Sequence, residues 1–154
     1  MGLFDRIKQK KISPKTVVIG LDGVPYSELL TKLIKDGELE NMASIFRQGY
    51  FGRMEVCIPE ISSVSWTSFM TGAQSGEHGI YGFMDLKPGT YEMYFPNFLN
   101  LKKKTLFDEL GAMGKRSVVI NLPSTYPARE IPGVLVSGFV AINLKKAVYP
   151  YSLI

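Results

Sequence analysis

The sequence is poor in cysteine and histidine, because its 154 residues contain one of each, Cys57 and His78. One cysteine cannot form an internal disulfide bond, which excludes a small secreted fold held together by disulfides. No apolar run approaches the roughly 20 residues that span a bilayer, and no apolar stretch follows the basic N-terminus as it would in a secretory signal. With 45% hydrophobic and 21% charged residues, the composition is typical of a globular domain. We therefore expect a reducing, cytoplasmic setting.

The excess of positive charge is confined to the first 15 residues. Residues 1–15 hold five basic side chains and one acidic side chain, whereas the remainder carries thirteen of each sign. A nucleic-acid-binding domain needs a basic face rather than a basic tail, so we expect no nucleic-acid partner. Leu3, Phe4 and Ile7 could share one face of a short helix with cations opposite, which leaves membrane-surface contact open beside a solvated extension.

Apolar runs alternate with helical periodicities along residues 16–154. The run at 16–21 is short, continuous and β-branched, which is typical of a strand buried on both faces. Regular spacing and Gly stops predict helices over 26–36, about 40–48, 62–71 and 105–114, and further strands over 50–57, 115–122 and 133–139. Residues 73–100 are read as a long ordered loop with room for one short strand. This alternation predicts an α/β domain with a largely parallel sheet.

The C-terminal segment follows a predicted buried strand without a closing helix. Parallel sheets need both faces covered, so we expect residues 16–154 to be the N-terminal part of one larger α/β domain. An open sheet edge would also permit association with another surface.

Two places along the chain could carry chemistry. Asp22 follows the first predicted strand, where ligands of open α/β sheets bind, although Asp22-Gly23 could equally be a simple turn. Ser62 and Ser63 begin a predicted helix, where converging N–H groups favour a phosphate oxygen, although N-capping alone would explain them. His78 lies between glycines and could be a metal ligand, a hydrogen-bonding partner or a loop-fixing residue.

Several motifs occur in an order that matches a known family. They are VVIGLDG (17–23), ENMASIFRQG (40–49), ISSVSWTSFMTGAQSGEHGIYGF (61–83), TLFDEL (105–110) and VVINLPSTYPAREIPGVLVSGF (118–139). The sequence resembles the alkaline phosphatase superfamily, in particular its type I phosphodiesterase/nucleotide pyrophosphatase branch and the relatives described as phosphohydrolases or phosphomutases. The resemblance implies the N-terminal part of an alkaline-phosphatase-like, three-layer α/β/α domain.

The resemblance also implies roles for individual residues. Asp22 falls on the aspartate that binds one of two divalent metal ions, with zinc expected first and manganese as the alternative. The nucleophile lies nine residues before the Thr of the TG motif, which is Thr71, and so corresponds to Ser62, also a metal contact, with Ser63 as the fallback. His78 matches a histidine outside the metal set. A sulfatase is excluded because Ile61 stands where its Arg should be and Cys57 is fourteen residues before Thr71.

The implied activity is metal-dependent hydrolysis of phosphate mono- or diesters, including nucleotides, through a phospho-serine intermediate. Members of the superfamily take further ligands, including three histidines, from the C-terminal part of the domain, whereas this chain has one histidine. We therefore expect the chain alone to be inactive or nearly so. Two alternatives stay open: a non-catalytic binding module that retains the fold, and a phosphomutase-like phosphotransferase. A membrane-associated relative acting on lipid or glycan phosphates would depend on residues 1–15.

Overall fold

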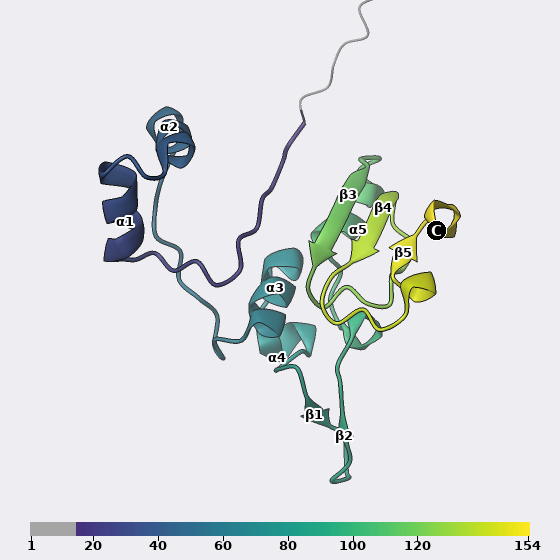
Figure 1. Ribbon diagram of the computed structural model, residues 1–154. Helices are drawn as coiled ribbons and strands as arrows, with labels where there is room; N and C mark the ends of the chain where they lie inside the picture. Colours follow the sequence, from purple (N-terminus) through teal and green to yellow (C-terminus); the bar gives the residue numbers. More distant parts are fainter. Residues whose placement is uncertain (1–14) are drawn as a thin grey trace, which may run out of the picture. The chain divides into compact units, whose positions relative to one another are not determined.

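The computed structural model describes residues 15–154, which divide into two compact units between Phe51 and Gly52 (Figure 1). Nearly all of the basic extension predicted over residues 1–15 lies outside the described residues. The same holds for the amphipathic face of Leu3, Phe4 and Ile7. Each unit has its own secondary structure, and each is described separately.

The first unit contains two helices, α1 (Glu28–Lys35) and α2 (Glu40–Gln48), as the periodicity predicted. Ser27 caps α1, because its hydroxyl accepts a hydrogen bond from the Leu30 N–H at 3.2 Å. The ring of Phe46 stacks on that of Phe51, with 4.1 Å between the centroids. Local capping and a small apolar contact therefore explain this unit.

The strand predicted over residues 16–21 is not formed. The segment is extended without strand pairing, and the side chains of Val17, Val18 and Ile19 are 80%, 65% and 79% exposed. The prediction of a strand over residues 50–57 is also wrong. A strand needs hydrogen bonds to a neighbouring strand, and neither segment takes part in the pairings among β1 to β5. An apolar β-branched run alone therefore does not make a strand.

The second unit is built on a three-stranded sheet of order β3-β4-β5. β3 and β4 run parallel, and β5 pairs with β4 in the antiparallel direction. The region predicted as a loop with one short strand holds a short antiparallel hairpin of β1 and β2, and it also contains a short helix that was not predicted. The strands are β1 (Asp85–Leu86), β2 (Met93–Tyr94), β3 (Ser117–Leu122), β4 (Gly133–Ser137) and β5 (Val148–Tyr149). The α/β class is confirmed, with a mixed sheet in place of the largely parallel one that was expected.

Helices of the second unit begin and end at residues with clear local causes. α3 ends at Gly72, which adopts the left-handed conformation with φ +63°. α5 begins at the capping box in which Thr105 and Asp108 accept each other's backbone N–H. The helices are α3 (Ser62–Thr71), α4 (Ser75–His78) and α5 (Leu106–Ala112), with single 3-10 turns η2 (Phe98–Asn100), η3 (Leu144–Lys146) and η4 (Tyr151–Leu153).

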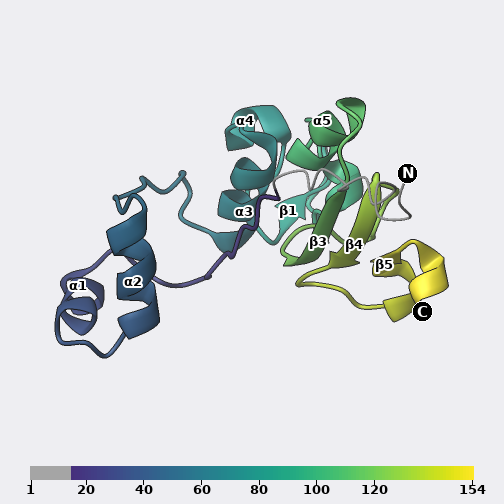
Figure 2. The same cartoon turned by 90° about the horizontal axis from the view of Figure 1, so that it is seen from above.

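The core of the second unit lies on one face of the sheet. Val119 of β3 and Leu135 of β4 pack there with Phe107 of α5, and Figures 1 and 2 show α5 against this face. Val118 and Ile120, which alternate with Val119, point to the opposite face and are 70% and 68% exposed. The sheet therefore has one covered face and one face that exposes β-branched apolar side chains.

Candidate functional site

Ser62 is the first residue of α3, at the end of the helix that carries partial positive charge. The N-cap residue is Ile61, which supplies no side-chain hydrogen bond to the first turn. An apolar N-cap leaves the first N–H groups to other partners, and this end of a helix favours negatively charged ligands. Ser62 is half-buried.

The two serines at the start of α3 differ in their surroundings. Ser63 is 3% exposed, and its buried hydroxyl has no hydrogen-bond partner in the structure. A hydroxyl enclosed in this way cannot reach a substrate without a local rearrangement. The difference in burial favours Ser62 over Ser63 as the residue that meets a ligand.

A loop at the carboxyl end of β3 contacts the first turn of α3. The Ser124 hydroxyl donates to the Ser63 carbonyl oxygen at 3.4 Å. Asn121 and Ser124, with φ +58° and +63°, are the two non-glycine residues of the described chain with positive φ. Sequence analysis singled out neither residue, because no local pattern required a left-handed backbone at either position.

Asp22 lies in the first unit and Ser62 in the second, so the structure describes each within its own unit. Asp22 is exposed and forms a turn with Gly23, whose φ is +70°. Among residues 15–154, no three His, Cys, Asp or Glu side chains gather as a metal-binding group.

His78 fixes the loop that follows α3. The side chain is fully buried, and its Nδ1 accepts a hydrogen bond from the Ile80 N–H at 3.1 Å, while Nε2 lies 3.1 Å from the Ser68 hydroxyl. A ring that accepts at Nδ1 carries its proton on Nε2 when neutral, so it donates to Ser68. Burial lowers the pKa of His78, and the nearby charge of Glu77 opposes this in part. Of the roles that the sequence left open, the contacts support a loop-fixing residue.

Cys57, the residue weighed as a sulfatase-type nucleophile, also has a local partner. Its thiol donates to the Ser65 hydroxyl at 3.3 Å, and the residue is half-buried beside α3. The contact therefore joins the segment before α3 to the helix itself.

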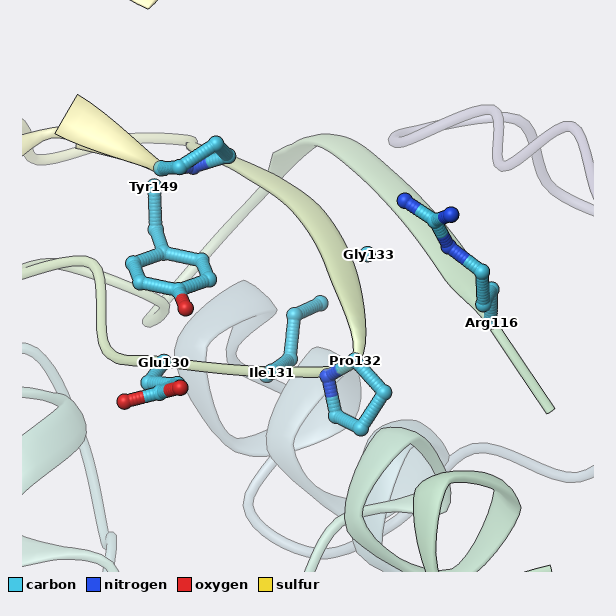
Figure 3. Close-up of a pocket in the computed structure, with 7 residues that line it drawn as sticks. Arg116, Glu130, Ile131, Pro132, Gly133 and Tyr149 are labelled. Atoms are coloured by element: carbon cyan, nitrogen blue, oxygen red, sulfur yellow. The ribbon is translucent and has the colours of Figure 1, made fainter. Parts of the chain in front are cut away.

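A hollow of about 480 Å³ lies at the opposite end of the sheet (Figure 3). Arg116, just before β3, and Gly133, the first residue of β4, place it at the amino ends of the parallel strands. Tyr149 lines the hollow, and its hydrogen bond to the Glu130 carboxylate raises the pKa of the phenol. Ligands of open α/β sheets bind beyond the carboxyl ends, so the first turn of α3 and the Asn121–Ser124 loop are the stronger candidate.

None of the helices within residues 15–154 has the length and apolar character required to cross a membrane.

Comparison with known proteins gives one match. The family model of type I phosphodiesterase/nucleotide pyrophosphatase matches residues 16–150. No curated protein and no solved structure gives a significant match. The matched range includes both Asp22 and Ser62. Since the match extends over most of the 154 residues, the chain belongs to the type I phosphodiesterase/nucleotide pyrophosphatase family.

Proposed function

We propose that the protein is a phosphoric-ester hydrolase in which Ser62 attacks the phosphorus of a phosphate mono- or diester. The family indicates activity of the phosphodiesterase/nucleotide pyrophosphatase type. The observation that carries the assignment to Ser62 is its position: it is half-buried at the start of α3, behind an N-cap that supplies no side-chain hydrogen bond. Charge that develops on a serine oxygen or a phosphoryl group is stabilised at this end of a helix.

The reaction has two steps on this residue. In the first, the Ser62 oxygen bonds to phosphorus, the bond to the leaving oxygen breaks, and the serine proton passes to the leaving alcohol. In the second, water attacks the phospho-serine, which releases the phosphate product and restores the hydroxyl. Transfer to another hydroxyl in place of water would give the phosphomutase-like alternative.

Metal dependence and the role of Asp22 enter the proposal through the family resemblance. Asp22 is the metal carboxylate that the resemblance assigns to this chain, and Ser62 is the second contact. Two divalent ions, zinc or manganese, complete the proposed enzyme. Since the remaining ligands are assigned to the C-terminal part of the domain, we expect this chain by itself to hydrolyse esters poorly or not at all.

The experiment that tests the proposal separates the two serines. The natural gene product, with its intact mass and metal content recorded, is assayed on p-nitrophenyl phosphate and bis(p-nitrophenyl) phosphate. Ser62→Ala should abolish turnover, and acid quenching of the unmodified protein should trap one phosphoryl group on Ser62. Ser63→Ala is the matched control in the same helical turn and should retain activity.

Each outcome has a definite meaning. Activity that survives Ser62→Ala but is lost in Ser63→Ala would assign the nucleophile to Ser63. Activity that survives both substitutions would exclude the phospho-serine mechanism.

A further inference from the structure

The end of β3 and the start of the loop that follows it are held in an unusual conformation near the first turn of α3, and these residues are called the Asn121–Ser124 loop. A left-handed backbone costs non-glycine residues free energy, and such residues persist where the surrounding structure fixes them. Asn121 and Ser124 share this conformation within four residues, φ +58° and +63°. Two non-glycine residues with a left-handed backbone within four positions must be held by surrounding contacts, and this conformation can serve a function.

The structural cause is a buried network behind the loop. Thr125 is fully buried, its hydroxyl donates to the Leu122 carbonyl at 2.6 Å, and the same oxygen accepts from the Gly138 N–H at 3.2 Å. Ser137, the last residue of β4, donates to the Thr125 carbonyl at 2.8 Å. These bonds involve both strand ends, so the loop is rigid on the side that faces the core.

Close packing of the two strand ends adds a second constraint. A Cβ placed on Gly138 would lie 2.5 Å from the Leu122 carbonyl oxygen and 2.6 Å from the Asn121 backbone. The backbone after β4 therefore presses directly on the backbone of β3, where the pairing register shifts between Ile120 and Leu122. Asn121 lies at this shift in register and is exposed to solvent.

The other side of the loop faces the first turn of α3. Ser124 donates to the Ser63 carbonyl oxygen at 3.4 Å, one residue from Ser62, and Figures 1 and 2 both show the end of β3 beside α3. Carboxyl ends of parallel strands are where open α/β sheets bind ligands. An exposed amide held by a rigid loop at this edge is suited to donate hydrogen bonds to an anionic oxygen.

We infer that the Asn121–Ser124 loop forms the sheet-side wall of the Ser62 site, and that Asn121 is a substrate-contact residue whose side-chain amide donates to a phosphoryl oxygen. The inference rests on the proposed function for its substrate class. Ser124 has a different part in it: it positions the loop against α3 and does not touch the substrate.

A phosphate titration tests the inference without turnover. In the 15N–1H spectrum of the 154-residue chain, the Asn121 side-chain NH2 signals are identified by their absence in Asn121→Gly, a variant that tolerates the left-handed backbone. Inorganic phosphate should shift these signals in a saturable way. Signals that stay fixed, with or without shifts at Ser62 and Ser63, overturn the inference.

An activity assay on the natural gene product adds a matched comparison. Asn121→Asp retains shape but replaces the amide donor by a carboxylate, and Asn121→Gly removes the side chain. Both should lower kcat/KM for p-nitrophenyl phosphate about 10- to 100-fold, as the loss of a hydrogen bond to a charged group does. Asn97→Asp introduces the same charge at the N-cap of η2, where a carboxylate can still accept from the Leu99 N–H, and should leave kcat/KM unchanged.

Failure of the inference and of the proposed function can be told apart. If Ser62→Ala is inactive and both Asn121 variants are fully active, the inference is wrong and the hydrolase proposal stands. If activity survives Ser62→Ala, the assignment of the nucleophile to Ser62 is wrong, and the phosphate titration still decides whether Asn121 binds the anion. An inactive protein leaves the decision to that titration as well.

Discussion

The Nε2 atom of His78 lies 3.1 Å from the hydroxyl oxygen of Ser68, and this contact joins the end of α4 to the middle of α3. The other ring nitrogen accepts from the Ile80 N–H. The bond from the Ile80 N–H requires the neutral ring with its proton on Nε2, because a protonated ring has no acceptor for Ile80, whereas Nε2–H can donate to Ser68 in either state. The position of the loop after α3 therefore depends on the charge of one buried histidine.

The first prediction follows from that dependence. Burial lowers the pKa of His78 from its ordinary value of 6.5, and the charge of Glu77 raises it less. Because the folded pKa is the lower one, the unfolded chain takes up the proton first as the pH falls. The contribution of His78 is complete above about pH 6.5 and decreases as the pH falls toward the folded pKa, at no more than about 1.4 kcal/mol per pH unit.

Urea unfolding between about pH 5 and pH 8 measures this effect. His78→Gln, which does not titrate, should have a lower free energy of unfolding at neutral pH and lack the additional decline below pH 6.5. The charge of Glu77 raises the pKa of His78, so Glu77→Gln serves as a control that removes this charge. Glu77 also forms an ion pair with Lys103 at 2.9 Å, which the same substitution removes. Parallel curves for the unmodified protein and His78→Gln would contradict the prediction.

A second prediction concerns the ion pair between Asp108 of α5 and Arg129. Burial by itself would raise the pKa of the Asp108 carboxyl, but hydrogen bonds from the Thr105 N–H and hydroxyl, together with the charge of Arg129, hold it below its usual value. The stabilisation is present above the ordinary value of 3.8 and is lost as the pH falls through the lowered folded value. Asp108→Asn should cost about 1–3 kcal/mol at neutral pH in chemical unfolding.

The control for this ion pair is an exposed ion pair between α5 and the residue before its N-cap. Lys104 and Glu109 are 3.9 Å apart and largely in solvent, so Glu109→Gln should change the free energy of unfolding by less than about 0.5 kcal/mol. Equal costs for the two substitutions would show that burial and the capping box add nothing at Asp108.

A third prediction tests the parallel pairing of β3 with β4. Gly133 has φ +142°, and a Cβ there would lie 1.9 Å from the Ser117 carbonyl oxygen of the neighbouring strand. Gly133→Ala should therefore cost more than about 4 kcal/mol or prevent folding, as circular dichroism and thermal melting would show. Gly76→Ala in α4, where no atom lies within 4 Å of the added Cβ, should stabilise by about 0.5–1 kcal/mol. A folded Gly133→Ala protein of normal stability would refute this strand pairing.

A fourth prediction concerns the buried hydroxyl of Ser63. The group is enclosed without a hydrogen-bond partner, which costs free energy in the folded state. Ser63→Ala removes this cost and leaves a void of one oxygen atom. We expect the melting temperature to stay the same or rise, whereas a loss of more than about 1 kcal/mol would mean that the hydroxyl has a bonded partner.

Local sequence signals predicted α1, α2, α3 and α5, whereas α4 lies in the region that was read as a loop. Ser27, Gly72 and the Thr105-Asp108 pair are capping or terminating residues, and they act on backbone groups within four positions of themselves. The start of α3 was also predicted at the serine pair, although its N-cap is Ile61 and no side chain caps it. The apolar runs of β3 and β4 were also recognisable as strands, and in the structure these two runs pair with each other.

The same kind of signal was wrong for residues 16–21, because strand formation depends on a partner that the run itself does not contain. The sequence pattern also could not decide which of Ser62 and Ser63 is the more exposed, because burial depends on which residues pack against the helix. The sequence by itself determined the family, the helix limits and the list of reactive side chains, all of which depend on neighbours along the chain. Only the tertiary structure decided that His78 fixes a loop and that Asn121 and Ser124 adopt a left-handed backbone beside α3, because those states are imposed by contacts between distant residues.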